Sequence, residues 1–160
     1  MTVWPARVPE SARPEPANTI TYQSKITASF VHASLDSIKD QVLPKSSFDS
    51  SALQLDFWPH KGTSEWLQFE WDTKHEVGCM KIYWFDDTGR GECHLPKSWK
   101  VLYRDDNDKW LPVINNTAYL VEKDKLNEVR FKPVHTDAIK IEILLQKNWA
   151  AGIYEVIIEQ

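Results

Sequence analysis

The run Trp66-Leu-Gln-Phe-Glu-Trp71 decides the fold class, because large apolar side chains alternate with polar ones along it. Successive side chains of a β-strand point to opposite faces of its sheet. The run therefore places Gln68 and Glu70 on one face and Leu67 and Phe69 on the other. This alternation predicts a strand in a sheet that has one buried face.

Seven further runs are rich in β-branched and aromatic residues, and turn-forming clusters such as Asp105-Asp-Asn-Asp108 separate them. They cover residues 26–31, 77–85, 99–104, 110–114, 128–132, 138–145 and 153–159. Only residues 35–42 suit a helical turn or two, which Pro44 stops. About eight antiparallel strands without alternating helices predict an all-β jelly roll or β-sandwich. We expect the tryptophans within the strands to be core residues, namely Trp66, Trp71, Trp99 and Trp110.

Length and composition favour a single globular domain: 160 residues, of which 42% are hydrophobic and 26% charged. Residues 1–19 hold four of the nine prolines and predict an extended linker or arm, which leaves residues 20–160 as the domain. Eight tryptophans are many for this length. Such a surplus is typical of surfaces that stack ring-shaped ligands.

Charge and hydropathy argue against two classes of partner. A net charge of −4 and a pI near 5.7 disfavour nucleic acid and anionic membranes, which call for basic stripes. No apolar run approaches the ~20 residues of a membrane helix, and no signal peptide is visible at the N-terminus. Neither the spacing nor the context of Cys79 and Cys93 demands a disulfide, so we expect two free thiols.

The run Trp84-Phe-Asp-Asp-Thr-Gly-Arg-Gly91 follows a predicted strand and brings aromatic rings, carboxylates and a guanidinium onto one loop. A sugar ring has apolar C–H faces and a rim of hydroxyls, so it suits flat aromatic faces beside fixed hydrogen-bonding groups. The alternative interpretation is a polar hairpin turn whose aromatic residues lie in the core. Both interpretations stay open for the loop alone.

The order of the elements resembles the discoidin domain, also called the coagulation factor 5/8 type C domain. That family includes the family 32 carbohydrate-binding modules and has the galactose-binding-like jelly roll. The resemblance covers residues 24–159 and rests on Ile26-Thr-Ala-Ser-Phe30, Trp58-Pro-His60, Glu65-Trp-Leu-Gln-Phe-Glu70, Leu95-Pro-Lys-Ser-Trp-Lys-Val-Leu-Tyr103 and Gly152-Ile-Tyr-Glu-Val156. The stretches Trp58-Pro-His-Lys-Gly-Thr63 and Tyr83-Trp-Phe-Asp-Asp-Thr-Gly-Arg90 are similar to β-sandwich domains attached to bacterial glycoside hydrolases of family 127.

The resemblance implies that loops at one end of the sandwich hold sugar. By position, it assigns carbohydrate contacts to Trp58, His60, Lys61, Phe85, Asp86, Asp87, Arg90, Asn148 and Trp149. The central loop departs from the common galactose-binding pattern, because Asp-Asp-Thr-Gly-Arg replaces Arg followed by Asn. The alternative roles are structural: His60 caps its loop, and Trp58 is a wall of the core.

The resemblance also implies a structural calcium ion that pins the loop after the first strand against the last strand. Asp40 and Glu155 match the two carboxylate positions, and Ser46 or Ser47 could add a hydroxyl or carbonyl oxygen. Calcium prefers carboxylate and carbonyl oxygens. In the alternative, Asp40 caps a turn and Glu155 forms a salt bridge.

Catalytic interpretations have little support. Adjacent Asp86 and Asp87 diverge in an extended loop, whereas glycoside hydrolysis needs two carboxylates across a cleft. The chain has no Gly-x-Ser-x-Gly elbow, and Cys79, Cys93, His94 and His60 lack zinc-ligand spacing.

The sequence thus predicts a non-catalytic carbohydrate-binding module, part of a carbohydrate-active enzyme, that binds a plant or microbial polysaccharide or oligosaccharide. The second hypothesis is a structural accessory domain that packs against a catalytic glycoside hydrolase domain in the same chain. For either function we expect an extracellular or periplasmic location.

Overall fold

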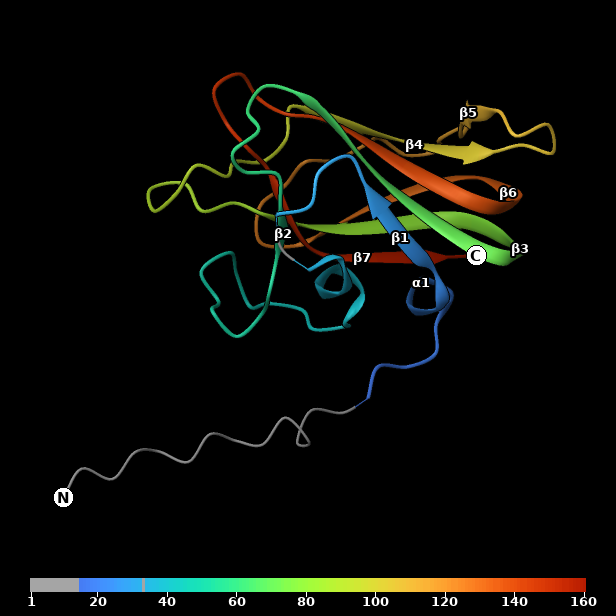
Figure 1. Cartoon of the computed structure of the whole chain (residues 1–160), viewed down its shortest axis with the longest axis horizontal. Helices are drawn as coiled ribbons and strands as arrows, with labels where there is room; N and C mark the ends of the chain where they lie inside the picture. The colour runs from blue at the N-terminus through green and yellow to red at the C-terminus, as the bar shows by residue number, and fades with distance from the viewer. Residues whose placement is uncertain (1–14, 33) are drawn as a thin grey trace.

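The computed structural model describes residues 15–32 and 34–160, which form an antiparallel β-structure with two short helices (Figure 1). Its seven strands follow the order β2-β7-β3-β6-β4-β5, and β1 pairs with β3. The strand bounds are β1 Lys25–Ala28, β2 Leu55–Asp56, β3 Ser64–Phe85, β4 Ser98–Arg104, β5 Trp110–Pro112, β6 Leu126–Leu144 and β7 Gly152–Glu159. The helices are α1, Ile20–Gln23, and the 3₁₀ helix η2, Leu35–Lys39. Neither helix of the described chain is long enough to cross a membrane.

Two long strands, β3 and β6, join the two layers of the sandwich. The first part of β3, residues 64–70, pairs with β1 and with residues 138–144 of β6, which in turn pair with β4. The last part of β3, residues 79–85, pairs with β7 and with residues 126–130 of β6. Shifts in register at Glu70/His75 and Val77/Cys79 mark the bend between the two halves. Bulges of this kind increase twist and let a strand turn from one layer into the other.

The strand count differs from the predicted eight for a physical reason. Runs 66–71 and 77–85 are continuous in β3, and runs 128–132 and 138–145 are continuous in β6. Strand β2 has only two residues, too few for a visible alternation. Two mergers and one addition turn eight runs into seven strands, and the all-β jelly-roll prediction is confirmed.

The core lies between the layers and contains large side chains from both. Trp84, Phe57, Phe69 and Phe131 are fully buried, and Trp84 meets Trp99 edge to face at 5.7 Å. Each such burial stabilises the fold by about 1.5–3 kcal/mol. Cys79 and Cys93 are buried free thiols, as expected. Burial raises the pKa of Cys79 to about 11, so this thiol is neutral at physiological pH.

The prediction that all four strand tryptophans are core residues is wrong for two of them. Trp71 and Trp99 are buried, but Trp66 and Trp110 are half-buried on the outer face of the β3–β6–β4–β5 layer. There Lys140 Nζ lies 5.6 Å from the Trp66 ring centroid and 4.2 Å from that of Trp110. Trp66 lies on the same face of β3 as Gln68 and Glu70, whereas the buried face carries Glu65, Leu67, Phe69 and Trp71.

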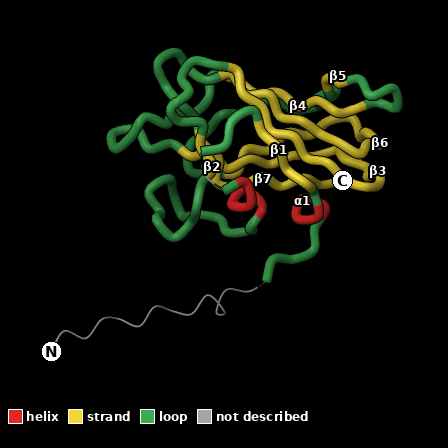
Figure 2. Tube along the Cα trace, viewed as in Figure 1, coloured by secondary structure: helices red, strands yellow, loops and turns green. Residues whose placement is uncertain are grey.

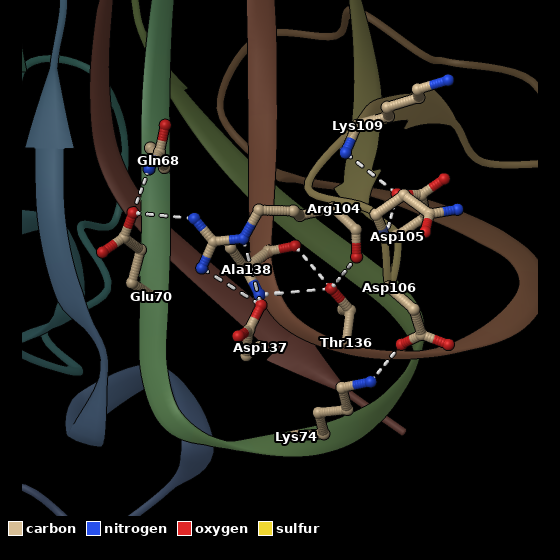
Figure 3. Close-up of polar contacts among 11 residues, drawn as sticks. Gln68, Glu70, Lys74, Arg104, Asp105, Asp106, Lys109, Thr136, Asp137 and Ala138 are labelled. Atoms are coloured by element: carbon tan, nitrogen blue, oxygen red, sulfur yellow. Dashed lines mark hydrogen bonds and ion pairs between the residues drawn. The ribbon is translucent and has the colours of Figure 1, made fainter.

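A polar network covers the same outer face near the β3 bend (Figure 3). The Arg104 guanidinium donates to Asp137 Oδ1 at 3.1 Å and reaches Glu70 Oε1 at 3.5 Å. Thr136 Oγ1 donates to the Arg104 carbonyl at 2.8 Å. At this end of the sandwich, these polar groups therefore bond to one another.

The other end consists of loops (green in Figure 2). Loop 57–63 contacts loop 145–151 because Gly62 N donates to the Trp149 carbonyl at 3.2 Å. Loop 86–97 contacts the same loop, because Ala150 N donates to the Glu92 carbonyl at 2.9 Å. Three loops distant in the sequence thus form one rim.

Residues 1–14 of the predicted arm, which spans residues 1–19, lie outside the described residues. Within residues 15–19, Ala17 exchanges two hydrogen bonds with the Gln41 side chain, at 2.9 and 2.7 Å. Thr19 caps α1 by accepting from Tyr22 N at 3.1 Å. This short stretch therefore lies against the domain.

Candidate functional site

A hollow of about 360 Å³ opens at the loop end of the sandwich. Three of the nine predicted carbohydrate contacts line it: Trp58, Phe85 and Asp87. The sequence interpretation missed the other members of the wall, which are His32, Gln54, Asp56, Gly91, Glu92 and Cys93. His32 follows β1, Gln54 and Asp56 come from β2 and the residue before it, and Phe85 is the last residue of β3. Loops 57–63 and 86–97 supply the others.

Trp58 presents an aromatic surface to the hollow, because its side chain remains 43% exposed. Its Nε1 donates to Glu92 Oε2 at 2.7 Å, and its ring meets that of His32 edge to face at 5.4 Å. Lys61 Nζ binds the same Glu92 oxygen at 2.9 Å. Both bonds hold the pKa of Glu92 below its ordinary value. The indole is therefore exposed yet fixed in orientation.

Asp56 is the buried acid of the hollow, with only 7% of its surface exposed. Its Oδ1 lies 2.8 Å from His32 Nδ1 and accepts from Trp58 N at 3.2 Å. Sequence reasoning missed both His32 and Asp56. Asp56 could have been found from its position two residues before Trp58, where the chain enters the same loop.

Asp87 lies at the base of a tight turn. Its carbonyl accepts from Arg90 N at 2.8 Å and Gly91 N at 2.9 Å, and its Oδ1 accepts from Cys93 N at 2.8 Å. A Cβ on Gly91 would stand 2.1 Å from Asp87 Oδ2. Glycine at position 91 therefore provides the space that the carboxylate occupies.

Asp86 points the other way and is 6% exposed. Its carboxylate accepts from Thr88 N at 3.0 Å, Thr88 Oγ1 at 2.5 Å and Leu95 N at 2.9 Å, and Lys123 Nζ lies 3.7 Å away. Burial alone would raise the pKa of Asp86, but these bonds and the lysine charge bring it below its ordinary value. The residue anchors the loop, and it does not line the hollow.

Arg90 also lies outside the wall of the hollow. Its guanidinium stands over the Phe48 ring at 4.3 Å, and Lys123 Nζ is 4.9 Å from the same ring. Such cation–π contacts contribute about 0.5–1 kcal/mol at exposed sites. The structure thus places Arg90 against loop 41–54.

His60 fixes loop 57–63 to the start of β3. Its Nδ1 lies 2.6 Å from Glu65 Oε1, and its ring packs on Phe30 at 4.1 Å. Glu65 is 4% exposed and also accepts from Ser29 and Thr63. Burial opposes ionisation, yet the three donors bring the pKa of Glu65 below its ordinary value.

Loop 145–151 holds Asn148 and Trp149. Trp149 is half-buried and stacks on His94 at 3.5 Å with an interplanar angle of 13°. Asn148 is exposed and has a left-handed backbone conformation, with φ of 69°. One face of the Trp149 indole is therefore covered by His94, and neither residue lines the hollow.

The structure brings together two of the three predicted calcium ligands. Glu155 is 1% exposed; its Oε1 accepts from Gln41 N at 3.1 Å, and its Oε2 has no partner among the described residues. Burial, followed by neighbouring Asp40, raises the pKa of Glu155 to about 9. No contact of the described residues joins Ser46 to this pair; its hydroxyl accepts from Phe48 N. Nor do those residues hold a cluster of three or more His, Cys, Asp or Glu side chains placed for a metal.

Several solved structures share this fold at low sequence identity. A chain of the Streptococcus pneumoniae β-galactosidase BgaA has a TM-score of 0.72 at 17% identity, covering 86% of this chain and 92% of that one. The family 32 module of C. perfringens NanJ, solved with galactose, has a TM-score of 0.65 at 14% identity, covering 87% and 95%. Chitosan-binding module 1 of a Paenibacillus sp. IK-5 chitosanase/glucanase has a TM-score of 0.62 at 11% identity, covering 88% and 98%.

The sequence model of one family matches most of the chain, from residue 25 to residue 156. The match begins at the first residue of β1 and ends within β7, so it includes β1 to β6, the first part of β7 and all three loops of the rim. The chain belongs to the F5/8 type C domain family.

Proposed function

We propose that this protein is a non-catalytic carbohydrate-binding module that binds glycan in the hollow at the loop end. The observation that carries the proposal is the exposed, immobilised indole of Trp58 beside carboxylates of the same hollow. A fixed aromatic ring needs little further ordering when it stacks on a ligand, so little entropy opposes binding.

Each side chain has a definite role in the proposed complex. The Trp58 indole stacks on the C–H face of a sugar ring, while Asp87 and Asp56 accept hydrogen bonds from its hydroxyls. Stacking contributes about 1–2 kcal/mol, and a bond to a charged acceptor about 1.5–3 kcal/mol. One such site predicts dissociation constants from about millimolar to tens of micromolar. Contacts from the other six residues stay predictions, because they lie outside the wall of the hollow: His60, Lys61, Asp86, Arg90, Asn148 and Trp149.

The related structures support this assignment by their ligands. The NanJ module is bound to galactose, and the Paenibacillus module is named for chitosan. We infer further that the module belongs to a larger glycoside hydrolase of family 127, located outside the cell or in the periplasm. The similar sequences at residues 58–63 and 83–90 support that parent.

A structural calcium ion is a further part of the proposal. Asp40 and Glu155 would hold it, since Glu155 Oε2 is a buried oxygen without a partner among the described residues. A divalent cation there would neutralise two adjacent carboxylates and join the segment after η2 to β7. Ser46 is not needed, because backbone carbonyls complete such shells.

A glycan array probed with the full chain tests the function, and titration calorimetry then gives the affinity for each glycan found. Trp58→Ala should weaken binding at least tenfold with an unchanged melting temperature, because the indole is exposed and lies outside the core. Trp110→Ala is the matched control: it removes a half-buried tryptophan from the opposite end and should leave binding intact. Absence of binding to any glycan would contradict the proposal, and so would equal affinity of the Trp58→Ala variant.

A further inference from the structure

The charges of the hollow are unbalanced. Three carboxylates line it, Asp56, Asp87 and Glu92. Glu92 forms an ion pair with Lys61 at 2.9 Å, and Asp56 Oδ1 lies within hydrogen-bond distance of His32 Nδ1 at 2.8 Å. No Lys, Arg or His of the described residues forms an ion pair with Asp87. The cavity wall therefore has one carboxylate without a counter-charge, next to an exposed indole.

A second oxygen in the hollow also lacks a donor. Asp56 is more than nine-tenths buried, and both of its hydrogen bonds reach Oδ1. Its Oδ2 receives no bond from the part of the chain that the structure describes, although the residue lines the hollow. Asp56 Oδ2 is not one of the fully buried side-chain oxygens of the described residues that lack a partner, so it faces open space and can accept a hydrogen bond from a ligand in the hollow.

Asp87 is held in a position from which it can meet a ligand. Its Oδ1 accepts from Cys93 N, while its Oδ2 lies beside the Cα of Gly91, where a larger residue would collide with it. The carboxylate is thus fixed at the wall by the backbone, and no cationic side chain covers it. Its full negative charge is available to the contents of the hollow.

From this arrangement we infer that the hollow selects sugars with a protonated amine, such as glucosamine residues, over neutral and anionic sugars. The inference deepens the proposed function and rests on it. An ammonium group has three donors and a positive charge, which suit Asp87 and the free oxygen of Asp56. An N-acetyl group removes the charge and adds bulk. A uronic acid would bring a second carboxylate against Asp87, which like-charge repulsion opposes.

Calorimetric titration of the full chain with four trisaccharides tests the selection. Three are β-1,4-linked trimers of glucosamine, N-acetylglucosamine or glucose, which differ only in the group at C2. The fourth is trigalacturonic acid. At neutral pH and low salt, the glucosamine trisaccharide should bind about tenfold more tightly than the glucose trisaccharide, and trigalacturonic acid more weakly than either. The preference should shrink as salt is added, because it is electrostatic.

Asp87→Asn separates charge from shape. The amide oxygen still accepts from Cys93 N, so the variant should fold. Its affinity for every sugar should fall, because Asp87 is also the proposed acceptor of hydroxyl groups. The readout is therefore the ratio of two affinities: the tenfold preference for the glucosamine trisaccharide over the glucose trisaccharide should disappear. Asp106→Asn is the charge-matched control, since its exposed side chain lies on the β4–β5 turn, away from the loops. Equal affinity of the wild type for all four sugars would overturn the inference, as would an equal loss of preference in Asp106→Asn.

The failure of the inference is distinguishable from that of the proposed function. If none of the four trisaccharides binds but other glycans bind on the array through Trp58, the inference is refuted and the proposed function stands. If no glycan binds in either experiment, both are refuted.

Discussion

Removal of the Asp86 carboxylate should destabilise the fold through the loop that carries the site. Asp86→Ala deletes the acceptor of three hydrogen bonds, from Thr88 N, Thr88 Oγ1 and Leu95 N, in a residue that is 6% exposed. Thr88 is exposed and its groups can bind water instead, but Leu95 N is half-buried and loses its partner. We therefore expect a loss of about 3 kcal/mol in the free energy of unfolding. For a domain of this size, that corresponds to a decrease of roughly 6–12 °C in the melting temperature.

The same carboxylate predicts a pH dependence with a definite sign. Because the folded-state pKa of Asp86 is lowered, its contribution is complete above the unfolded value near ~4 and is lost as the pH falls through the folded value. Urea unfolding of the wild type and of Asp86→Asn should therefore differ most at pH 6–7. The difference should shrink as the pH falls below about 4.

Two results would refute this reasoning. One is an Asp86→Ala variant with wild-type stability, and the other is a difference between wild type and Asp86→Asn that stays constant down to pH 3. Glu122→Gln is a suitable control, because its carboxylate is exposed and forms only a surface ion pair with Lys125 at 2.8 Å. Such pairs contribute about 0–1 kcal/mol.

Two further predictions concern the metal and the turn of the hollow. A calcium chelator should lower the melting temperature, because an ion that binds only the native state stabilises it by mass action; an unchanged melting curve, with no calcium found by elemental analysis, would exclude a site at Asp40 and Glu155. Gly91→Ala should weaken glycan binding severalfold in calorimetry, since its Cβ would stand 2.1 Å from Asp87 Oδ2 and displace that carboxylate. Gly89→Ala is the control: its Cβ meets no atom within 4 Å, and although its φ of 92° costs stability, affinity of the folded fraction should be unchanged.

The strands could be read from local alternation, because one buried face imposes a period of two on the residues of each run. That argument places Leu67 and Phe69 in the core correctly. The expectation that Trp66 and Trp110 are core residues is wrong because it came from the type of residue, which does not say which face of a strand is covered; the alternation itself places Trp66 on the face of Gln68 and Glu70. The alternation misses the continuity of β3 and β6, because a bend between two layers leaves the pattern of each half intact.

The candidate site was visible in the sequence only in part. Trp58, Phe85 and Asp87 supply the aromatic rings and the carboxylate that a sugar site requires. The family resemblance pointed to the loops that hold them. The roles of Asp86 and Asp87 differ even though they are neighbours, because adjacent side chains in an extended loop point apart: Asp86 turns inward to Thr88 and Leu95, and Asp87 turns to the hollow.

The sequence alone determined the all-β class, the family and the loops of the proposed site, since these depend on short-range pattern and on the order of motifs. Tertiary structure alone decided the composition of the hollow. His32, Asp56 and Glu92 come from three segments, and they meet only because β2 pairs with β7 and loop 86–97 bonds to loop 145–151. Charge balance in a cavity is a property of residues that are distant in the chain, so no local pattern contains it.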